Sequence, residues 1–251
     1  MVWIFGDGYS ENVCCIGRVA NFAMIHYHGT PLTPRAELYK MAGKHFCVSF
    51  AHPGDAEVCL QIGQSVMWDN GAFTAFTKGL QFESHDFYRW VEPKLGHPHW
   101  AVIPDVIDGT LEQQKERLKE WPFATDFAAP VWHLGLPTDY LLELADNYPK
   151  ICFGSSGEYW QVGSPKWEKR TDEAFNALSQ KRRYLPWIHM LRGLAQAGKR
   201  WPFASADSVN VARNFKNGNG RCPEIMARKI DSIQTPIGWE NQNINQMEIS
   251  L

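Results

Sequence analysis

Eight short apolar segments alternate with longer amphipathic or charged stretches, and this alternation constrains the fold more than any other feature of the chain. Apolar runs of this length are typical of buried strands, whereas the charged stretches between them have the periodicity of helices. Strands that alternate with helices form parallel sheets. The predicted strands cover residues 22–27, 45–50, 65–69, 100–105, 128–134, 150–155, 187–191 and 203–207.

Helices are expected between most of these strands. The length of 251 residues suits an α/β barrel that forms one domain. The sequence therefore predicts a single (β/α)8 TIM-type barrel over residues 1–251, with a doubly wound open sheet as the alternative. The connector after the second strand is too short and broken to assign, and the other predicted helices cover residues 33–42, 84–95, 110–121, 137–147 and 165–183.

Polar or turn-forming residues stand at the ends of five predicted strands. They are Asp69, Asp105, His133, the turn that contains Gly154 and Ser155, and Asp207. In a barrel of this kind the carboxyl ends of the strands meet at one mouth, where the chemistry takes place. Any one of these residues could simply cap a helix or form a turn. Their shared position predicts one functional site.

Two of these carboxylates suggest a reaction at a sugar carbon. A carboxylate can capture an oxocarbenium-like carbon covalently while a second carboxylate moves protons. Asp69, in the stretch SVMWDNGAF, and Asp207 are the candidates. The glycines Gly71 and Gly154 would let backbone amides approach a flat ligand closely. The alternative is that both belong to ordinary turns.

Basic residues are concentrated in one part of the chain. The formal charge of the whole chain is −2, yet more than half of its lysines and arginines lie in residues 166–229. Such a segment predicts a surface for a polyanion, with a solvated basic face as the alternative. The candidate nucleic-acid contacts are Lys181, Arg182, Arg183, Arg213 and Lys216.

Other features predict a soluble protein of the cytoplasm. No apolar stretch is long enough to cross a membrane, and the first residues lack the pattern of a signal peptide. Six scattered cysteines are expected to be reduced core residues. His26 and His28 could form a metal pair, but without a clear third ligand they are better explained by packing or by a substrate loop.

The order of short motifs WDNGAF, IPDVID, VWHLG, FGSSGE, IHMLRG and ASADS resembles that of the tRNA-guanine transglycosylase superfamily. It is most similar to the DNA-modifying branch, the 7-deazaguanine DNA transglycosylases. The likeness covers about residues 45–214. It implies an enzyme that exchanges guanine in DNA for a 7-deazaguanine such as 7-cyano-7-deazaguanine, through a covalent bond between an aspartate and the sugar.

The resemblance also implies roles for individual residues. Asp207 matches the nucleophile that attacks C1′, and Asp69 matches the general acid/base that acts on the exchanged base. Asp105 matches a residue that reads the base edge, with Asp108 as a nearby alternative. His133 stands where the family has a glutamine that contacts the base. The backbone at Gly154 and Ser155 and the turn at Gly71 complete the base site, and Phe73, Trp132 or Tyr159 could stack on the base.

The resemblance further bears on cofactors and partners. The tRNA-specific enzymes carry three cysteines and a histidine for zinc after the nucleophile, whereas only Cys222 follows Asp207 here. We therefore expect no metal and no other cofactor. The expected partners are DNA, with RNA in second place, a free 7-deazaguanine base and helper proteins, without a membrane. The alternatives are a tRNA-guanine transglycosylase-like enzyme on RNA, a nucleoside or glycoside hydrolase with the same carboxylates, and a non-catalytic nucleic-acid-binding member.

Overall fold

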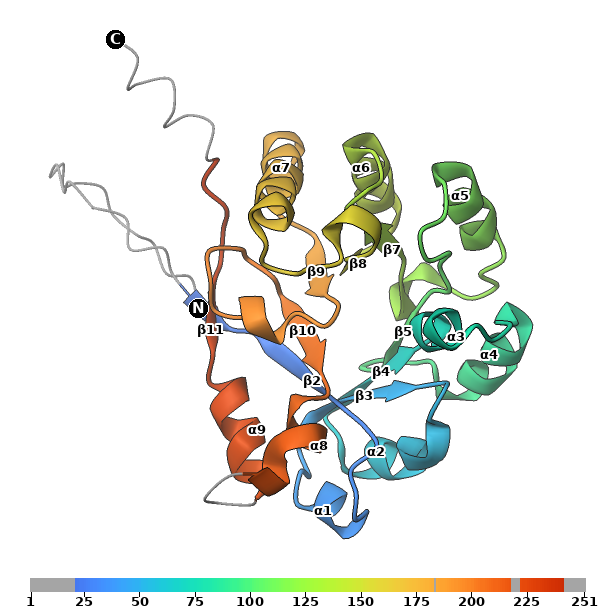
Figure 1. Cartoon of the computed structure of the whole chain (residues 1–251), viewed down its shortest axis with the longest axis vertical. Coiled ribbons are helices and arrows are strands. Elements are labelled where there is room, and N and C mark those ends of the chain that lie inside the picture. The colour runs from blue at the N-terminus through green and yellow to red at the C-terminus, as the bar shows by residue number, and fades with distance from the viewer. Residues whose placement is uncertain (1–20, 183, 218–221, 242–251) are drawn as a thin grey trace, which may run out of the picture.

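The computed structural model describes residues 21–182, 184–217 and 222–241 (Figure 1). Within these residues one sheet of nine parallel strands has the order β6-β5-β4-β3-β2-β10-β9-β8-β7. Each of the eight predicted strands overlaps a strand of this sheet. The strands are β2 (Ile25–Gly29), β3 (His45–Ser49), β4 (Ser65–Asp69), β5 (Trp100–Val102), β6 (Ala128–Ala129), β7 (Val131–His133), β8 (Lys150–Gly154), β9 (Trp187–Met190) and β10 (Ser205–Ser208).

The sheet curls into a nearly closed barrel. Its first and last long strands pair in parallel, with Asp207 of β10 opposite Tyr27 of β2. The two ends of the sheet, β6 and β7, are halves of one predicted strand on either side of Pro130. The first half pairs with β5 and the second with β8. The carbonyl of Pro130 still accepts from the Cys152 backbone amide at 2.9 Å, although the proline itself has no N–H to donate.

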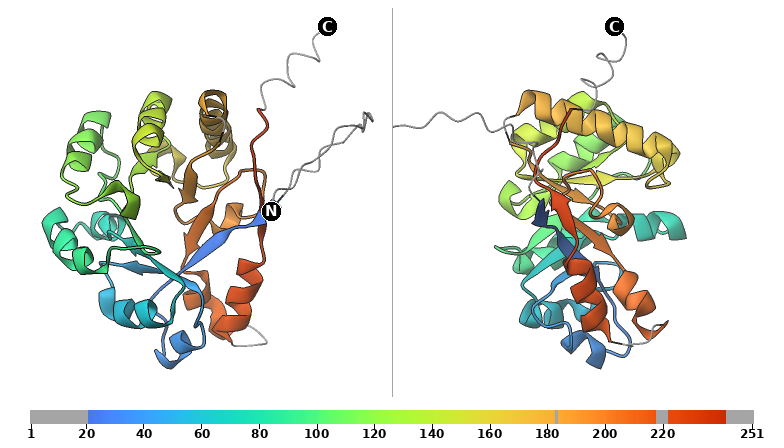
Figure 2. Two further views of the ribbon diagram at one scale, coloured as in Figure 1. Left: turned by 180° about the vertical axis from the view of Figure 1, so that it is seen from behind. Right: turned by 90° about the vertical axis from the view of Figure 1, so that its left-hand side faces the viewer.

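Helices surround the strands (Figure 1), so the prediction of a (β/α)8 barrel is confirmed and the open doubly wound sheet is wrong. The views in Figure 2 show α6 and α7 side by side on the outside of the barrel. A short antiparallel pair, β1 (Asn21–Ala23) and β11 (Gln234–Pro236), lies outside the main sheet. The helices are α1 (Ala36–Tyr39), α2 (Ala56–Ile62), α3 (Ala72–Lys78), α4 (Ser84–Val91), α5 (Leu111–Lys119), α6 (Thr138–Asn147), α7 (Pro165–Lys181), α8 (Asn210–Asn214) and α9 (Pro223–Asp231).

The helix predictions differ from the structure at both ends of the chain. The helix expected over 33–42 is reduced to α1, a single turn that begins after Pro34 and is soon followed by Gly43, whose φ of +79° lies outside the helical region. The segment 53–62, within the connector that the sequence does not assign, is a 3₁₀ turn followed by α2. The short helices α3, α8 and α9 are not predicted by the sequence. By contrast, α5 begins where a capping box forms between Thr110 and Gln113.

Alternation along the strands separates two kinds of core. Side chains on one face pack against the helices, whereas those on the other face fill the barrel. The inner cluster includes Tyr27, Cys47, Met67, Trp100 and Cys152, and the Trp100 indole donates to the Tyr27 hydroxyl at 2.8 Å. In the part of the chain that the structure covers, no helix is both long and apolar enough to span a membrane.

The same alternation delivers polar residues to one end of the barrel. Asp69 follows the buried Met67 by two positions on β4, so both share the inner face. Asp207 follows Ser205 by two positions on β10. The register pairs Asp69 with Ser49, the last residue of β3. The strand ends therefore bring these side chains together at the mouth of the barrel.

Candidate active site at the barrel mouth

Asp207 is held at the mouth by two hydrogen bonds to the same oxygen. Its Oδ1 accepts from the backbone N–H of Arg192 at 2.7 Å and lies 3.3 Å from Nε2 of His189. The other ring nitrogen of His189 lies 2.8 Å from the Ser205 hydroxyl. Burial by itself would raise the pKa of Asp207, but the hydrogen bond and charge of His189 and the Arg192 amide outweigh it, so the pKa is lowered. The carboxylate is therefore ionised, and both of these hydrogen bonds are to its Oδ1.

Asp69 has the opposite electrostatic character. Burial raises its pKa from 3.8 to about 6, and the nearby charges of Asp207 and Asp105 act in the same direction. Hydrogen bonds from the Ser49 side chain and the Gly71 backbone amide only partly offset these effects. A carboxyl group with a pKa near neutrality can both accept and donate a proton.

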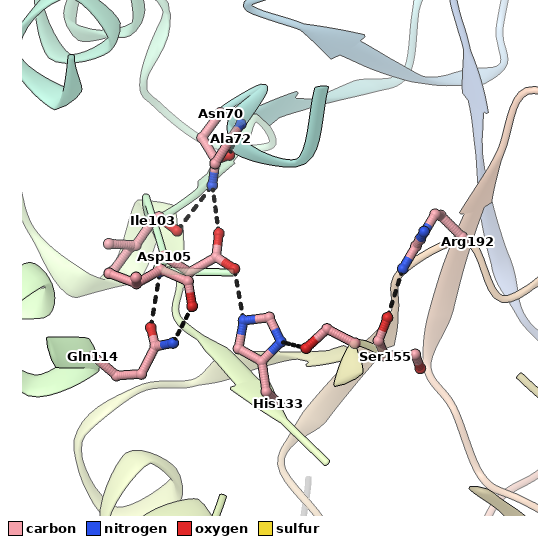
Figure 3. A network of polar contacts seen from close by, with 10 residues as sticks. Asn70, Ala72, Ile103, Asp105, Gln114, His133, Ser155 and Arg192 are labelled. Carbon is pink, nitrogen blue, oxygen red and sulfur yellow. Dashed lines mark hydrogen bonds and ion pairs between the residues drawn. The ribbon is translucent and has the colours of Figure 1, made fainter. Parts of the chain in front are cut away.

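Asp105 lies on the same side of the mouth in a network of polar side chains (Figure 3). Its Oδ2 is 2.7 Å from Nε2 of His133, and its Oδ1 accepts from the Asn70 amide at 3.3 Å. The same Asn70 amide donates to the Ile103 carbonyl at 3.0 Å. The alternative Asp108 is exposed in the loop before α5. The structure therefore brings Asp105 and His133 together as predicted, and the network adds Asn70.

The turn after β8 supplies the wall next to His133. A Cβ atom at Gly154 would come within 2.9 Å of Nδ1 of His133, so the close approach requires glycine. That same nitrogen lies 3.1 Å from the Ser156 hydroxyl. The Ser155 side chain is buried and accepts from the Trp167 indole at 2.8 Å, so it anchors the turn to α7. Its backbone carbonyl accepts from the Arg192 side chain at 2.8 Å.

The turn after β4 also depends on a glycine. Gly71 has a φ of +79°, which is the left-handed region that favours glycine. It precedes α3, and the Asn70 side chain accepts from the Ala72 amide at 2.7 Å. This turn places Phe73 at the mouth with 41% of its surface exposed. Of the other stacking candidates, Trp132 is buried against Arg170 of α7, and Tyr159 lies beneath Lys166.

Arg192 completes the mouth from the loop after β9. Its backbone has a φ of 56°, which is uncommon for a residue with a side chain. Its guanidinium carbon lies 4.1 Å from the centre of the Phe73 ring. One of its nitrogens donates to the Ser155 carbonyl at 2.8 Å, as Figure 3 shows. Arg192 therefore links Phe73 after β4 and Ser155 after β8 with Asp207 of β10.

The predicted nucleic-acid contacts do not lie together. Lys181 and Arg182 lie at the end of α7, shortly before β9 begins. The strands begin at the end of the barrel opposite the carboxylates, so these two residues lie there too. Arg182 is also paired with Asp146 at the end of α6. Arg213 and Lys216 are exposed just after β10, on the mouth side. Arg183 lies outside the described residues. Of the described candidates, only Arg213 and Lys216 therefore follow a strand end at the mouth.

The direction of α7 explains this separation. A helix between two parallel strands must run back from the mouth, so the last residues of α7 lie far from the strand ends. Arg170, near the start of the same helix, is used internally, because it donates to the carbonyls of Leu134 and Leu136. The clustering of basic residues in sequence therefore reflects the composition of α7 and its neighbours and not one surface.

The histidine pair of β2 is part of the packing under α9. Nε2 of His28 lies 2.8 Å from Asp231, which also accepts from Lys44 at 2.7 Å. His26 lies 2.9 Å from the Ser208 hydroxyl, and burial lowers its pKa to about 3, so its ring is neutral. Among the described residues no three histidine, cysteine or acidic side chains are grouped as metal ligands.

The cysteines that the structure describes are free. Cys47, Cys59 and Cys152 are buried, and Cys222 is partly exposed. Cys14 and Cys15 lie outside the described residues.

Sequence reasoning missed several residues of the site. No local pattern in the sequence singles out His189 or Ser49. Their contacts with Asp207 and Asp69 follow from the register of the strands. His189 shares the inner face of β9 and supports Asp207, whereas Ser49 lies opposite Asp69. Asn70 and Arg192 lie within motifs of the sequence that do not by themselves indicate a role for either. The alternation of inner and outer positions could have identified His189, since Leu191 two positions later is also an inner residue.

The fold and the mouth together define a (β/α)8 barrel with three carboxylates of different environments at the carboxyl ends of its strands. Comparison of the chain with models of protein families, with curated proteins and with solved structures finds no match. The function is therefore argued from the site itself.

The opposite pKa shifts predict opposite effects on stability. The raised pKa of Asp69 contributes stability at low pH that is lost as the pH rises from 3.8 towards about 6. The free energy of unfolding of Asp69→Asn, measured relative to that of wild type, should therefore increase by about 1–3 kcal/mol as the pH is raised from 4 to 8. Chemical denaturation of both proteins at a series of pH values measures this difference.

Asp207→Asn provides the internal control. The lowered pKa of Asp207 contributes stability above the ordinary pKa of an aspartate, and this is lost as the pH falls. Relative to wild type, the variant should therefore lose stability as the pH rises towards 3.8, and the difference between them should stay nearly constant from pH 4 to pH 8. If both variants changed in the same direction with pH, the assignment of one raised and one lowered pKa would be wrong.

Proposed function

We propose that this protein exchanges guanine in DNA for a 7-deazaguanine base such as 7-cyano-7-deazaguanine. The observation that carries this proposal is that two carboxylates at one mouth differ in pKa. Asp207 is kept ionised, and Asp69 has a pKa of about 6. Base exchange at a sugar requires a nucleophile that is always charged and a second group that changes its protonation state. The motif order WDNGAF to ASADS gives independent support.

In the first step the free Oδ2 of Asp207 attacks C1′ of the deoxyribose. The bond between C1′ and the glycosidic nitrogen breaks, and its electron pair leaves with guanine. The protonated carboxyl group of Asp69 gives its proton to the departing base, which makes guanine a better leaving group. The products are an ester between Asp207 and the sugar, neutral guanine and the carboxylate of Asp69.

The second step reverses the first with a different base. The Asp69 carboxylate takes the proton from the glycosidic nitrogen of the 7-deazaguanine. That nitrogen attacks C1′, and the ester bond breaks to regenerate the Asp207 carboxylate. Asp69 ends protonated, as it began. One group with a pKa near neutrality therefore serves both half-reactions, because neither protonation state is strongly favoured.

The network around Asp105 provides the base-reading side of the mouth. Asp105 can accept from the N–H groups of a guanine-like edge, while His133 and Asn70 fix its orientation. Because protein groups hydrogen-bond to both oxygens of Asp105, the carboxylate is held in place, and its remaining acceptor positions favour a base with matching N–H donors. The site thus supports discrimination by the edge of the base.

A hydrolase is the second candidate, and the placement of the basic residues favours it. Lys181 and Arg182 lie at the far end of the barrel, so they add little to binding of a polyanion at the mouth. A nucleoside or glycoside hydrolase would use Asp207 and Asp69 in the same way, with water in place of the incoming base. The two functions differ in the second step alone.

The nucleophile assignment predicts a covalent adduct. Incubation with guanine-containing DNA should give a protein–DNA species that survives denaturation and is visible by gel electrophoresis. Asp207→Asn should remove it, because an amide is a far weaker nucleophile than a carboxylate. Parallel reactions with tRNA would show whether RNA replaces DNA as the substrate. Activity that persists in Asp207→Asn would assign the nucleophile to another residue.

The role of Asp69 predicts that one variant impairs both half-reactions. Asp69→Asn should slow release of labelled guanine and incorporation of 7-cyano-7-deazaguanine by about 10²–10⁴-fold each, since a neutral amide cannot transfer the proton. Single-turnover release, followed by nucleoside analysis of the DNA, measures both. Wild-type protein that leaves abasic sites and never incorporates the base would establish the hydrolase instead.

The position of the basic residues predicts which of them respond to salt. Arg213→Gln with Lys216→Gln should reduce the slope of log affinity for duplex DNA against log salt by up to about 1.8, at about 0.9 for each phosphate that the side chains no longer neutralise. The matched pair Lys181→Gln with Arg182→Gln should leave the slope unchanged. A reduced slope in the second pair would place the phosphate path at the far end of the barrel.

A further inference from the structure

The side chain of Arg192 occupies a position for which the proposed reaction gives it no role. Its backbone amide supports Asp207, but its guanidinium extends away from that carboxylate to the Phe73 ring and the Ser155 carbonyl. Arg192 is exposed, and Phe73 is 41% exposed. Both groups could instead be fully solvated. Their contact therefore marks a place that favours a flat group with N–H donors.

The guanidinium has the same chemistry as one part of guanine. Guanine contains a planar guanidine unit, formed by N1, C2, N3 and the exocyclic amine. Both groups are flat, stack on aromatic rings and donate N–H groups to carbonyl oxygens. In this structure the Arg192 guanidinium lies 4.1 Å from the Phe73 ring centre and 2.8 Å from the Ser155 oxygen. These contacts are the ones that a guanine-like base would make.

We propose that Arg192 is a displaceable gate, whose guanidinium occupies the base site until guanine or a 7-deazaguanine replaces it. The inference rests on the proposed function, because it concerns the same mouth and the same class of ligand. Figure 3 shows Arg192 reaching towards Ser155 from the side opposite Asp105. A base that entered between them would meet Asp105 on one side and compete with Arg192 on the other.

The backbone of Arg192 suits such a gate. Its φ of 56° directs the loop so that the backbone amide faces Asp207 while the side chain crosses the mouth. The side chain can therefore move without release of the nucleophile. Residues held in this uncommon conformation are concentrated at functional sites. The gate and the support of Asp207 are thus separate functions of one residue.

A gate of this kind lowers the apparent affinity for the base, because only the open fraction of molecules can bind. Arg192→Gly removes the side chain, while glycine tolerates the positive φ and retains the backbone amide to Asp207. The variant should bind 7-cyano-7-deazaguanine about tenfold more tightly than wild type, since one stacking interaction and one hydrogen bond no longer compete. Isothermal titration calorimetry with this base measures the change.

Two further variants separate occupation of the site from charge. Arg192→Lys keeps the positive charge but lacks the planar group, so it should bind the base more tightly than wild type, as Arg192→Gly does. Arg89→Ala removes an exposed arginine of α4 that is paired with Asp86, and it should bind like wild type. If Arg192→Lys also bound like wild type, charge and not occupation would explain the effect, and the gate would be disproved.

Displacement itself can be observed by NMR. The Arg192 Nε–Hε signal, assigned by its loss in Arg192→Gly, should show a ring-current shift from Phe73 in the free protein. Saturation with 7-cyano-7-deazaguanine should move it to the position of a solvated arginine. A signal that stays in place while the base binds would overturn the gate and leave the exchange function standing. Absence of base binding in both wild type and Arg192→Gly would overturn both proposals together.

Discussion

The whole site depends on one constraint, the parallel register of a closed sheet. Because every strand of the barrel runs in the same direction, every strand end opens at the same mouth. Closure requires β10 to pair with β2, and it is this pairing that brings Asp207 of the last strand round to the first half of the barrel. The split at Pro130 allows one strand to pair with β5 through its first half and with β8 through its second. Without closure, Asp69 and Asp207 would stand at separate places along an open sheet.

At this mouth the neighbours of each carboxylate determine its pKa. His189 and a backbone amide donate to Asp207, so the ionised form is favoured despite burial. Asp69 receives weaker compensation and also experiences the negative charge of Asp207. The ionised Asp207 thus helps to hold a proton on Asp69. If Asp207 became an ester as proposed, that repulsion would disappear. Asp69 would then be more easily kept as a carboxylate, the form that the proposed second half-reaction requires.

Much of this arrangement could be predicted from the sequence, because alternation and strand ends are local signals. The strand-end residues Asp69, Asp105, His133 and Asp207 are brought to one mouth, as the alternation predicts. The contributions of His189 and Ser49 depend on which inner positions face one another across strands, and register is not a local property. The arrangement at Arg192 depends on a positive φ that the sequence does not signal at a non-glycine residue. The described basic residues of segment 166–229 do not form one surface for a related reason, because residues close in sequence can lie at opposite ends of the barrel.

Whether the proposed ester would react with a new base or with water depends on what fills the base site after guanine has left. The ester at Asp207 would then be exposed to water unless another group covers the vacant place. In the proposed gate Arg192 would return to the Phe73 ring at that moment, since its guanidinium contacts that ring and the Ser155 carbonyl. A returning guanidinium would exclude water yet still yield to a base that stacks and pairs better. If Arg192 is displaceable as proposed, it would favour exchange over hydrolysis in a site whose two carboxylates alone would permit either reaction.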